Sequence, residues 1–173
     1  MNKIFETPLY PYHKTADQSA TAPVRHSVVV IGAGPVGLGM AIDLAQHGID
    51  VIVLDDNDKV SFGSRAICFA KRTLEIADRL GFGDKLVAKG VQWNLGKVFF
   101  DQRKVYEFNL LAEDGHARPA FINLQQYYFE QYLVERVQEI NSDRQKIDNR
   151  DKNRVTAITD HGAYTALTIS TPD

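Results

Sequence analysis

At residues 27–37 the chain reads Ser-Val-Val-Val-Ile-Gly-Ala-Gly-Pro-Val-Gly, an apolar run that leads directly into closely spaced glycines. Gly32, Gly34 and Gly37 have the G-x-G-x-x-G spacing of a dinucleotide-binding turn between a strand and a helix. Gly32 allows the tight turn, and Gly34, which has no Cβ atom, lets a pyrophosphate approach the backbone. Gly37 allows the helix to pack closely on the sheet. The pattern therefore predicts an anion site at a helix N-terminus, where free N–H groups point outward.

A second strand and an acid supply the context that this pattern requires. Residues 51–54 read Val-Ile-Val-Leu without polar alternation, as expected of a parallel strand covered on both faces, and Asp55 follows them. In such sites an acid about 20 residues past the glycines accepts hydrogen bonds from an adenosine ribose. Pro35 suits the first turn of the helix, because its missing N–H is not needed there. We predict an α/β fold with a dinucleotide site formed by the glycines, Pro35 and Asp55. The alternative is a glycine-rich turn in an ordinary βαβ unit.

The composition limits the class of protein. The chain has 173 residues, 44% of them hydrophobic, and a formal net charge of −2, which does not favour nucleic acid or an anionic membrane as a partner. A single cysteine excludes an internal disulfide bond and a cysteine-based zinc site, and it fits a cytoplasmic location. No apolar run approaches the ~20 residues of a membrane span. The five histidines are scattered without the spacing of a catalytic triad or a metal site, so we expect no metal.

The chain divides into a short leader and a folded part. Residues 1–25 are polar, contain three prolines and lack the apolar centre of a signal peptide, so they are predicted to be a flexible leader. Residues 26–173 are predicted to be the folded domain. Within it, a helix should follow the glycine turn and end at Gly48 in a left-handed cap, and another should cover residues 71–80. Hairpins are predicted around the polar turns at residues 101–104 and 160–162.

The second half of the chain gives one strong and one weak signal. A helix is predicted to start at Asn123, which would cap it, with Gln126 completing a capping box. Its buried stripe would comprise Phe129, Leu133, Val137 and Ile140. Residues 141–154 are polar, and Ile147 is their only large apolar residue, so a strand there is only weakly indicated.

The chain resembles the FAD-dependent aromatic hydroxylases, flavoprotein monooxygenases similar to para-hydroxybenzoate and hydroxyphenylpropionate hydroxylases. The resemblance lies in residues 28–55, in Gly-Ser-Arg-Ala-Ile-Cys-Phe-Ala-Lys-Arg-Thr-Leu-Glu at residues 63–75, in Asp-Arg-Leu-Gly at 78–81, and in Pro-Ala-Phe-Ile-Asn-Leu-Gln-Gln-Tyr-Tyr at 119–128. It extends over residues 26–173 and is loose between 82 and 117. It implies an FAD-binding Rossmann-like domain with a parallel sheet and hairpin insertions.

The resemblance also implies roles for individual residues. Asp55 matches the acid that binds the adenosine ribose, where the family more often has the longer Glu. Arg65 matches an arginine that reaches the FAD phosphates, and a guanidinium makes strong bidentate bonds to phosphate. Gln125 matches a glutamine that contacts the cofactor near the ribityl chain. The alternatives are a solvated loop arginine at position 65 and an exposed first-turn residue at position 125.

The implied activity is hydroxylation of a small, phenol-like aromatic substrate with NAD(P)H and O₂, for which the sequence shows no catalytic acid–base constellation. Family members are several hundred residues long and carry later flavin-binding motifs that this chain lacks, so we expect an FAD-binding domain that is incomplete at its C-terminus and inactive alone. The uncharged segment 163–170 would then lie at a free sheet edge and promote self-association. Two alternatives remain open, a fragment of an NAD-dependent Rossmann dehydrogenase and a non-catalytic remnant.

Overall fold

The computed structural model describes residues 8–60 and 65–173 and divides the chain into two compact units. Unit 1 comprises Met1–Phe62 and Leu133–Asp173, and unit 2 is the intervening segment Gly63–Tyr132. The first seven residues of the predicted leader, and Gly63 and Ser64 of the family-like block, lie outside the described residues. That residues 26–173 form one domain stays a prediction.

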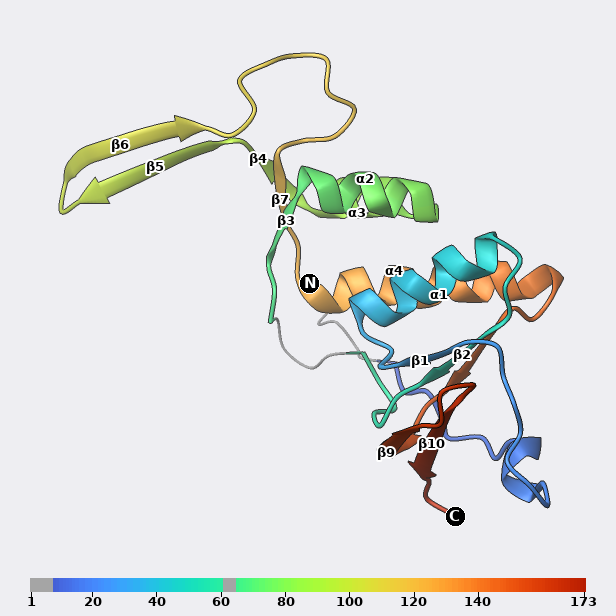
Figure 1. Cartoon of the computed structure of the whole chain (residues 1–173). Helices are drawn as coiled ribbons and strands as arrows, with labels where there is room; N and C mark the ends of the chain where they lie inside the picture. The colour runs from blue at the N-terminus through green and yellow to red at the C-terminus, as the bar shows by residue number, and fades with distance from the viewer. Residues whose placement is uncertain (1–7, 61–64) are drawn as a thin grey trace. The chain divides into compact units, whose positions relative to one another are not determined.

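Unit 1 is built on a parallel sheet of order β1-β2-β8, formed by β1 (Val29–Ile31), β2 (Val51–Leu54) and β8 (Ile147–Arg150). Helix α1 (Pro35–Gln46) contacts all three strands and covers one face of this sheet (Figure 1). All four residues of β2 are buried, which explains its unbroken apolar run. After α1, Gly48 adopts a φ of +82° and its N–H donates to the carbonyl oxygen of Ala45. The predicted strand–helix–strand unit and its glycine cap are therefore confirmed.

The weakly indicated strand is the third strand of this sheet. Ile147 is 1% exposed and lies opposite Val51 in the pairing of β8 with β2. The other side chains of β8 are polar because they have partners outside the sheet core: Arg150 lies between Asp148 and Asp17, at 2.7 Å from a carboxylate oxygen of each. Because the side chains of Asp148 and Arg150 form ion pairs rather than pack in an apolar core, the sequence of β8 shows little hydrophobic periodicity.

The remaining elements of unit 1 are a hairpin and an N-terminal segment. Strands β9 (Arg154–Asp160) and β10 (Thr165–Ser170) form the predicted antiparallel hairpin. A 3₁₀ helix, η1, covers Ala16–Ser19. Part of the predicted leader contacts the rest of unit 1, because the Tyr10 N–H donates to the carbonyl oxygen of Asp58 at 2.6 Å and Asp17 pairs with Arg150. The flexibility of this segment stays a prediction.

Unit 2 contains an antiparallel sheet of order β3-β7-β4, formed by β3 (Cys68–Ala70), β7 (Phe121–Asn123) and β4 (Val91–Trp93). The predicted helix α2 (Lys71–Leu80) is confirmed and is followed by α3 (Gly83–Lys89). Leu74, Leu86 and Ile122 are 0% exposed and form the centre of the unit, and the Phe69 ring stacks on Phe129 at 4.8 Å between centroids.

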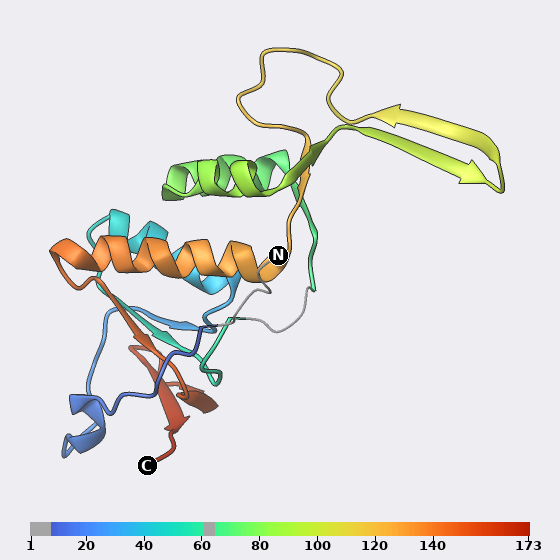
Figure 2. The same cartoon turned by 180° about the vertical axis from the view of Figure 1, so that it is seen from behind.

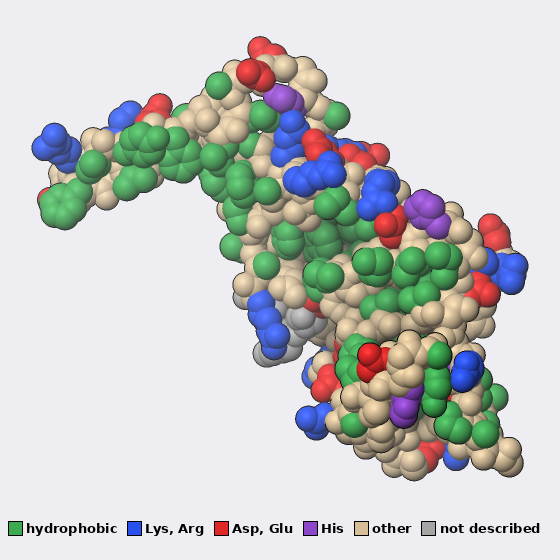
Figure 3. All heavy atoms as spheres, viewed as in Figure 1, with side chains coloured by type: hydrophobic (Ala, Val, Ile, Leu, Met, Phe, Trp, Pro, Cys, Tyr) green, Lys and Arg blue, Asp and Glu red, His purple; other side chains and the backbone are tan. Residues whose placement is uncertain are grey.

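The first predicted hairpin is confirmed as β5 (Leu95–Phe100) and β6 (Arg103–Asn109). It projects from the helices and the three-stranded sheet of unit 2 (Figure 2). Hydrophobic side chains line its surface (Figure 3). The exposed ones are Leu95, Val98, Phe99, Phe100, Val105 and Tyr106.

Helix α4 (Gln126–Asp143) begins three residues later than predicted. Asn123 does not cap it, because Asn123 is the last residue of β7, which pairs with strands on both sides. The Asn123 side chain instead accepts a hydrogen bond from the Trp93 indole N–H at 2.9 Å, and the Gln126 amide donates to Glu130. The predicted stripe is buried at Phe129, Leu133 and Val137 and half-buried at Ile140. Among the described residues, no helix is both long enough and apolar enough to cross a membrane.

Candidate dinucleotide site

The glycine turn connects the end of β1 to the start of α1. Gly32 has a φ of +100°, a backbone conformation that favours glycine, and its N–H donates to the carbonyl oxygen of Leu54 at 2.7 Å. This bond joins the turn to the end of the neighbouring strand. Gly34 is the N-cap residue of α1, and its carbonyl oxygen accepts the helical hydrogen bond from Leu38 at 3.0 Å. The turn therefore presents the N-terminus of α1 at the carboxyl edge of the parallel sheet.

The other two glycines of the G-x-G-x-x-G pattern have different surroundings, one open and one closely packed, as that pattern requires. Among the described residues, a Cβ atom placed on Gly34 would have no heavy atom within 4 Å apart from those of its own chain neighbours, so the space beside this residue is open. A Cβ atom on Gly37 would overlap the carbonyl oxygen of Gly32 and would lie 3.2 Å from the Val30 side chain. Gly34 thus leaves room for a ligand, whereas Gly37 permits the close packing of α1 on the turn.

Asp55 lies directly beside this turn. Its Oδ2 accepts a hydrogen bond from the Ala33 N–H at 2.6 Å, and its Oδ1 accepts two from Asn57, from the backbone N–H at 2.8 Å and the side-chain amide at 3.0 Å. A carboxylate has about four lone-pair sites. Among the described residues these bonds take three of the sites, which leaves one for a ligand hydroxyl.

The turn that follows β8 is hydrogen-bonded to the loop after β2. The Asn153 N–H donates to the carbonyl oxygen of Asp55 at 2.7 Å, and the Lys152 N–H donates to that of Asn57 at 3.1 Å. Asp151 precedes these two residues, and its pKa is raised to about 6 by burial and by the charges of Asp55 and Asp58. The sequence patterns did not single out Asp151. The only signal was its place after a strand, and the sequence indicated that strand weakly.

The structure brings together one further pair of predicted residues. Arg65 and Gln125 are both exposed and belong to unit 2, whereas the glycine turn and Asp55 belong to unit 1. Within unit 2, the pairing of β3 with β7 continues in a hydrogen bond from the Leu124 N–H to the carbonyl oxygen of Ile67 at 2.7 Å. Arg65 and Gln125 therefore lie at the same end of this sheet, although they are far apart in the sequence. Their contacts with a cofactor stay predictions.

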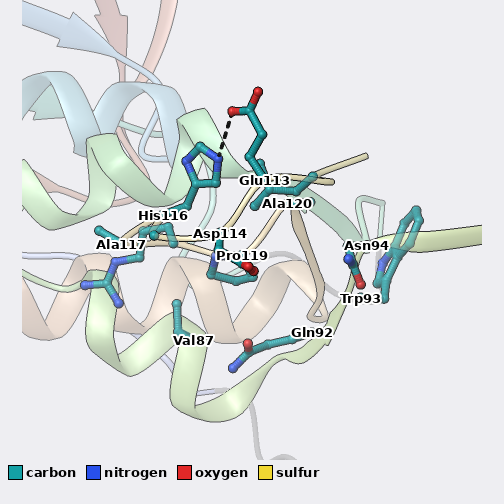
Figure 4. A pocket seen from close by; sticks show the side chains of 13 residues that line it. Val87, Gln92, Trp93, Asn94, Glu113, Asp114, His116, Ala117, Pro119 and Ala120 are labelled. Atoms are coloured by element: carbon teal, nitrogen blue, oxygen red, sulfur yellow. Dashed lines mark ion pairs between the residues drawn. The ribbon is translucent and has the colours of Figure 1, made fainter. Parts of the chain in front are cut away.

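Unit 2 also contains an open pocket of about 430 Å³ between α3, β4 and the loop at residues 111–120 (Figure 4). Three of the titratable residues in its lining, Glu113, His116 and Arg118, contact other protein side chains. The His116 ring lies 2.7 Å from the Lys71 ammonium and 3.9 Å from Glu113, the contact drawn in Figure 4. Arg118 pairs with Asp78 and Asp84, which raises the pKa of the guanidinium. In the described ranges, no group of three His, Cys, Asp or Glu residues could hold a metal ion.

Comparison with known sequences identifies a family. The model of a family described as FAD binding domain matches residues 25–170. Rifampicin monooxygenase from Rhodococcus hoagii is 30% identical over 119 residues, which are 69% of this chain and 24% of that protein. The 3-(3-hydroxy-phenyl)propionate/3-hydroxycinnamic acid hydroxylase of Escherichia coli is 40% identical over 73 residues, which are 41% of this chain and 13% of that protein.

Solved structures show the same fold. The crystal structure of p-nitrophenol 4-monooxygenase PnpA from Pseudomonas putida DLL-E4 matches with a TM-score of 0.76 and 26% identity, over 85% of this chain and 37% of that one. The flavin-dependent monooxygenase PieE, in complex with FAD and substrate, matches with a TM-score of 0.70 and 22% identity, over 85% of this chain and 27% of that one. The chain thus spans about a quarter or less of these curated relatives and about a third of these structures.

Proposed function

We infer the function from one premise: the chain belongs to the FAD binding domain family, whose model matches residues 25–170. The described residues fit the cofactor. The space beside Gly34 is open, and α1 presents its N-terminus there. Asp55 lies at the same sheet edge, and its contacts with described residues leave one lone-pair site for a ligand. The NAD-dependent alternative loses support, because the family model is that of an FAD domain.

We assign the residues of this site as follows. The turn that receives the pyrophosphate is formed by Gly32, Gly34, Pro35 and Gly37. The dipole and free N–H groups at the start of α1 favour that anion. Asp55 accepts a hydrogen bond from the adenosine ribose. Arg65 binds the phosphates, and Gln125 contacts the cofactor near the ribityl chain.

When FAD is bound, it supplies the redox chemistry, and the protein supplies binding, orientation and exclusion of water. We propose that the protein to which this domain belongs hydroxylates a small, phenol-like aromatic substrate with NAD(P)H and O₂. The names of the matched relatives support this reaction class, since they are monooxygenases and a hydroxylase of hydroxyphenyl compounds. A cytoplasmic location and the absence of nucleic-acid and membrane partners fit the composition and belong to the same proposal.

The observation that carries the FAD assignment is the open N-terminus of α1 beside Asp55 in a chain of this family. Isothermal titration of the 173-residue chain with FAD, NAD⁺ and ADP tests it. We expect FAD to bind most tightly, because ADP and NAD⁺ lack the ribityl and flavin groups. Replacement of Gln125 by Ala should weaken FAD binding and leave ADP binding unchanged. Tighter binding of NAD⁺ than of FAD would instead support the dehydrogenase alternative.

A further inference from the structure

Two carboxyl groups follow neighbouring strands of the parallel sheet in unit 1. Strands β2 and β8 pair in register, with Leu54 opposite Arg150, so Asp55 and Asp151 are the next residues on adjacent strands. The backbone continues this alignment, since the Asp55 N–H donates to the carbonyl oxygen of Arg150 at 3.1 Å. Neighbouring strands lie about 4.8 Å apart. A ligand group that contacts Asp55 would therefore also lie near Asp151.

The surroundings of Asp151 combine burial with negative charge. Burial raises its pKa, and the carboxyls of Asp55 and Asp58 raise it further, whereas hydrogen bonds from the Asn149 amide, at 2.9 Å, and from its own backbone lower it. Two cations are adjacent to Asp151 in the sequence, and one of them, Lys152, pairs with Asp58 at 3.0 Å. The guanidinium of Arg150 is held by Asp17 and Asp148. A further acid, Asp56, accepts a hydrogen bond from the Asn57 side chain in the loop after β2.

We propose that the protonation state of Asp151 sets the affinity of the adenosine end of this site for FAD. The inference rests on the FAD function proposed above. FAD carries negative charge on its pyrophosphate, and its ribose hydroxyls need an acceptor. Asp55 serves as that acceptor in either state of Asp151. Ionised Asp151 adds a second negative charge near an anionic ligand, whereas neutral Asp151 removes that repulsion and gains a hydrogen-bond donor.

The expected size of the effect follows from Coulomb's law. One unit charge about 10 Å from another, at an effective dielectric constant of 20–80, changes an equilibrium constant by roughly two- to fifteenfold. Because burial and the neighbouring acids bring the pKa of Asp151 to about 6, the change falls between about pH 5 and 7.5. FAD binding should therefore weaken by roughly two- to fifteenfold as the pH rises through this interval.

The test is the dissociation constant of FAD, measured at several pH values from about 5 to 8 by quenching of flavin fluorescence, for the wild-type chain and two variants. Asp151→Asn should make the constant independent of pH in this range. Asp58→Asn removes one of the charges that raise the pKa of Asp151 and frees Lys152, so it should move the midpoint to lower pH. Circular dichroism at each pH shows whether the variants are folded.

A ¹³C NMR titration of the Asp151 carboxyl in the wild-type chain gives a second measurement that needs no variant. By linkage, FAD should raise the pKa of this group, because the protonated form binds FAD more tightly. A wild-type constant without pH dependence, an unchanged dependence in folded Asp151→Asn, or a carboxyl pKa that FAD does not raise would overturn the role of Asp151 and leave the FAD assignment standing. Failure of every form to bind FAD at any pH would overturn the proposed function itself.

Discussion

The Gly34→Ala substitution separates cofactor binding from folding. Gly34 has φ −77° and ψ −175°, which alanine adopts without strain, and the added methyl group would meet no heavy atom within 4 Å. The substitution therefore introduces no clash within the described part of the protein. It places a methyl group in the space where the pyrophosphate is proposed to approach the turn.

Two small terms govern the free energy of unfolding of this variant. Alanine reduces the entropy of the unfolded chain, which stabilises by about 0.4–1 kcal/mol. Alanine is also a poorer N-cap residue than glycine, which costs about 0.5–1 kcal/mol. The two nearly cancel, so we expect a change of stability within about 0.5 kcal/mol. For binding, losing one charge-assisted hydrogen bond costs about 1.5–3 kcal/mol, which is roughly a 10- to 150-fold weaker affinity for FAD.

The assay pairs a thermal melt without cofactor with a fluorescence titration of FAD, for the wild-type chain and for Gly34→Ala. The expected result is an unchanged melting temperature and a lost or strongly weakened FAD affinity. If the variant binds FAD as tightly as the wild-type chain, the pyrophosphate does not approach Gly34. If the variant unfolds, the reasoning about open space beside this residue is wrong.

Four further outcomes are expected. Gly37→Ala should destabilise the chain by about 1–3 kcal/mol in chemical denaturation even without FAD, because the added methyl group overlaps the carbonyl oxygen of Gly32. An unchanged stability would contradict the close packing of α1 on the glycine turn. Arg118→Ala should lower the free energy of unfolding by about 1–2 kcal/mol, because it leaves two aspartates without their shared cation. The exposed control Lys104→Ala should change it by less than about 0.5 kcal/mol, and equal effects of the two substitutions would contradict the larger role given to Arg118. The carboxyl of Asp151 has a pKa raised from 3.8 to about 6, so the free energy of unfolding should fall as the pH rises from about 4 to 6. Asp151→Asn should abolish that fall and stabilise the chain at about pH 7.5 by about 1–2 kcal/mol after allowance for solvent screening. A steeper fall in the variant would show that the sign of this argument is wrong. Ile169→Lys should reduce self-association in sedimentation experiments, because β10 pairs only with β9 among the described strands and a charge protects a free edge; a wild-type chain that is already monomeric would refute it.

The sequence predicted those parts of the fold that local rules determine. The strand, glycine turn and helix at residues 29–46 follow from apolar runs and from glycine conformations that depend on neighbours in the chain. Both hairpins follow from polar turns between apolar segments. The helix after β7 was predicted with the wrong start, because pairing of β7 with strands on both sides keeps Asn123 extended, and no local pattern encodes that pairing.

Prediction of the candidate site from local sequence patterns meets the same limit. The glycine turn and Asp55 were predicted to lie together, and the structure places them in hydrogen-bonding contact. Asp151 could not be singled out, because its position depends on the pairing of β8 with β2, and β8 has few apolar residues since Arg150 is held by ion pairs. The position of Arg65 and Gln125 at the same end of a sheet likewise arises from the pairing of β3 with β7, two strands that are distant in the sequence.

The most direct test of the central claim is a crystal structure of the chain with FAD. We predict a pyrophosphate oxygen within hydrogen-bonding distance of the Gly34 N–H, and an adenosine ribose hydroxyl that donates to the carboxylate of Asp55. An adenosine diphosphate group bound away from the N-terminus of α1, or a ribose turned away from Asp55, would contradict this assignment.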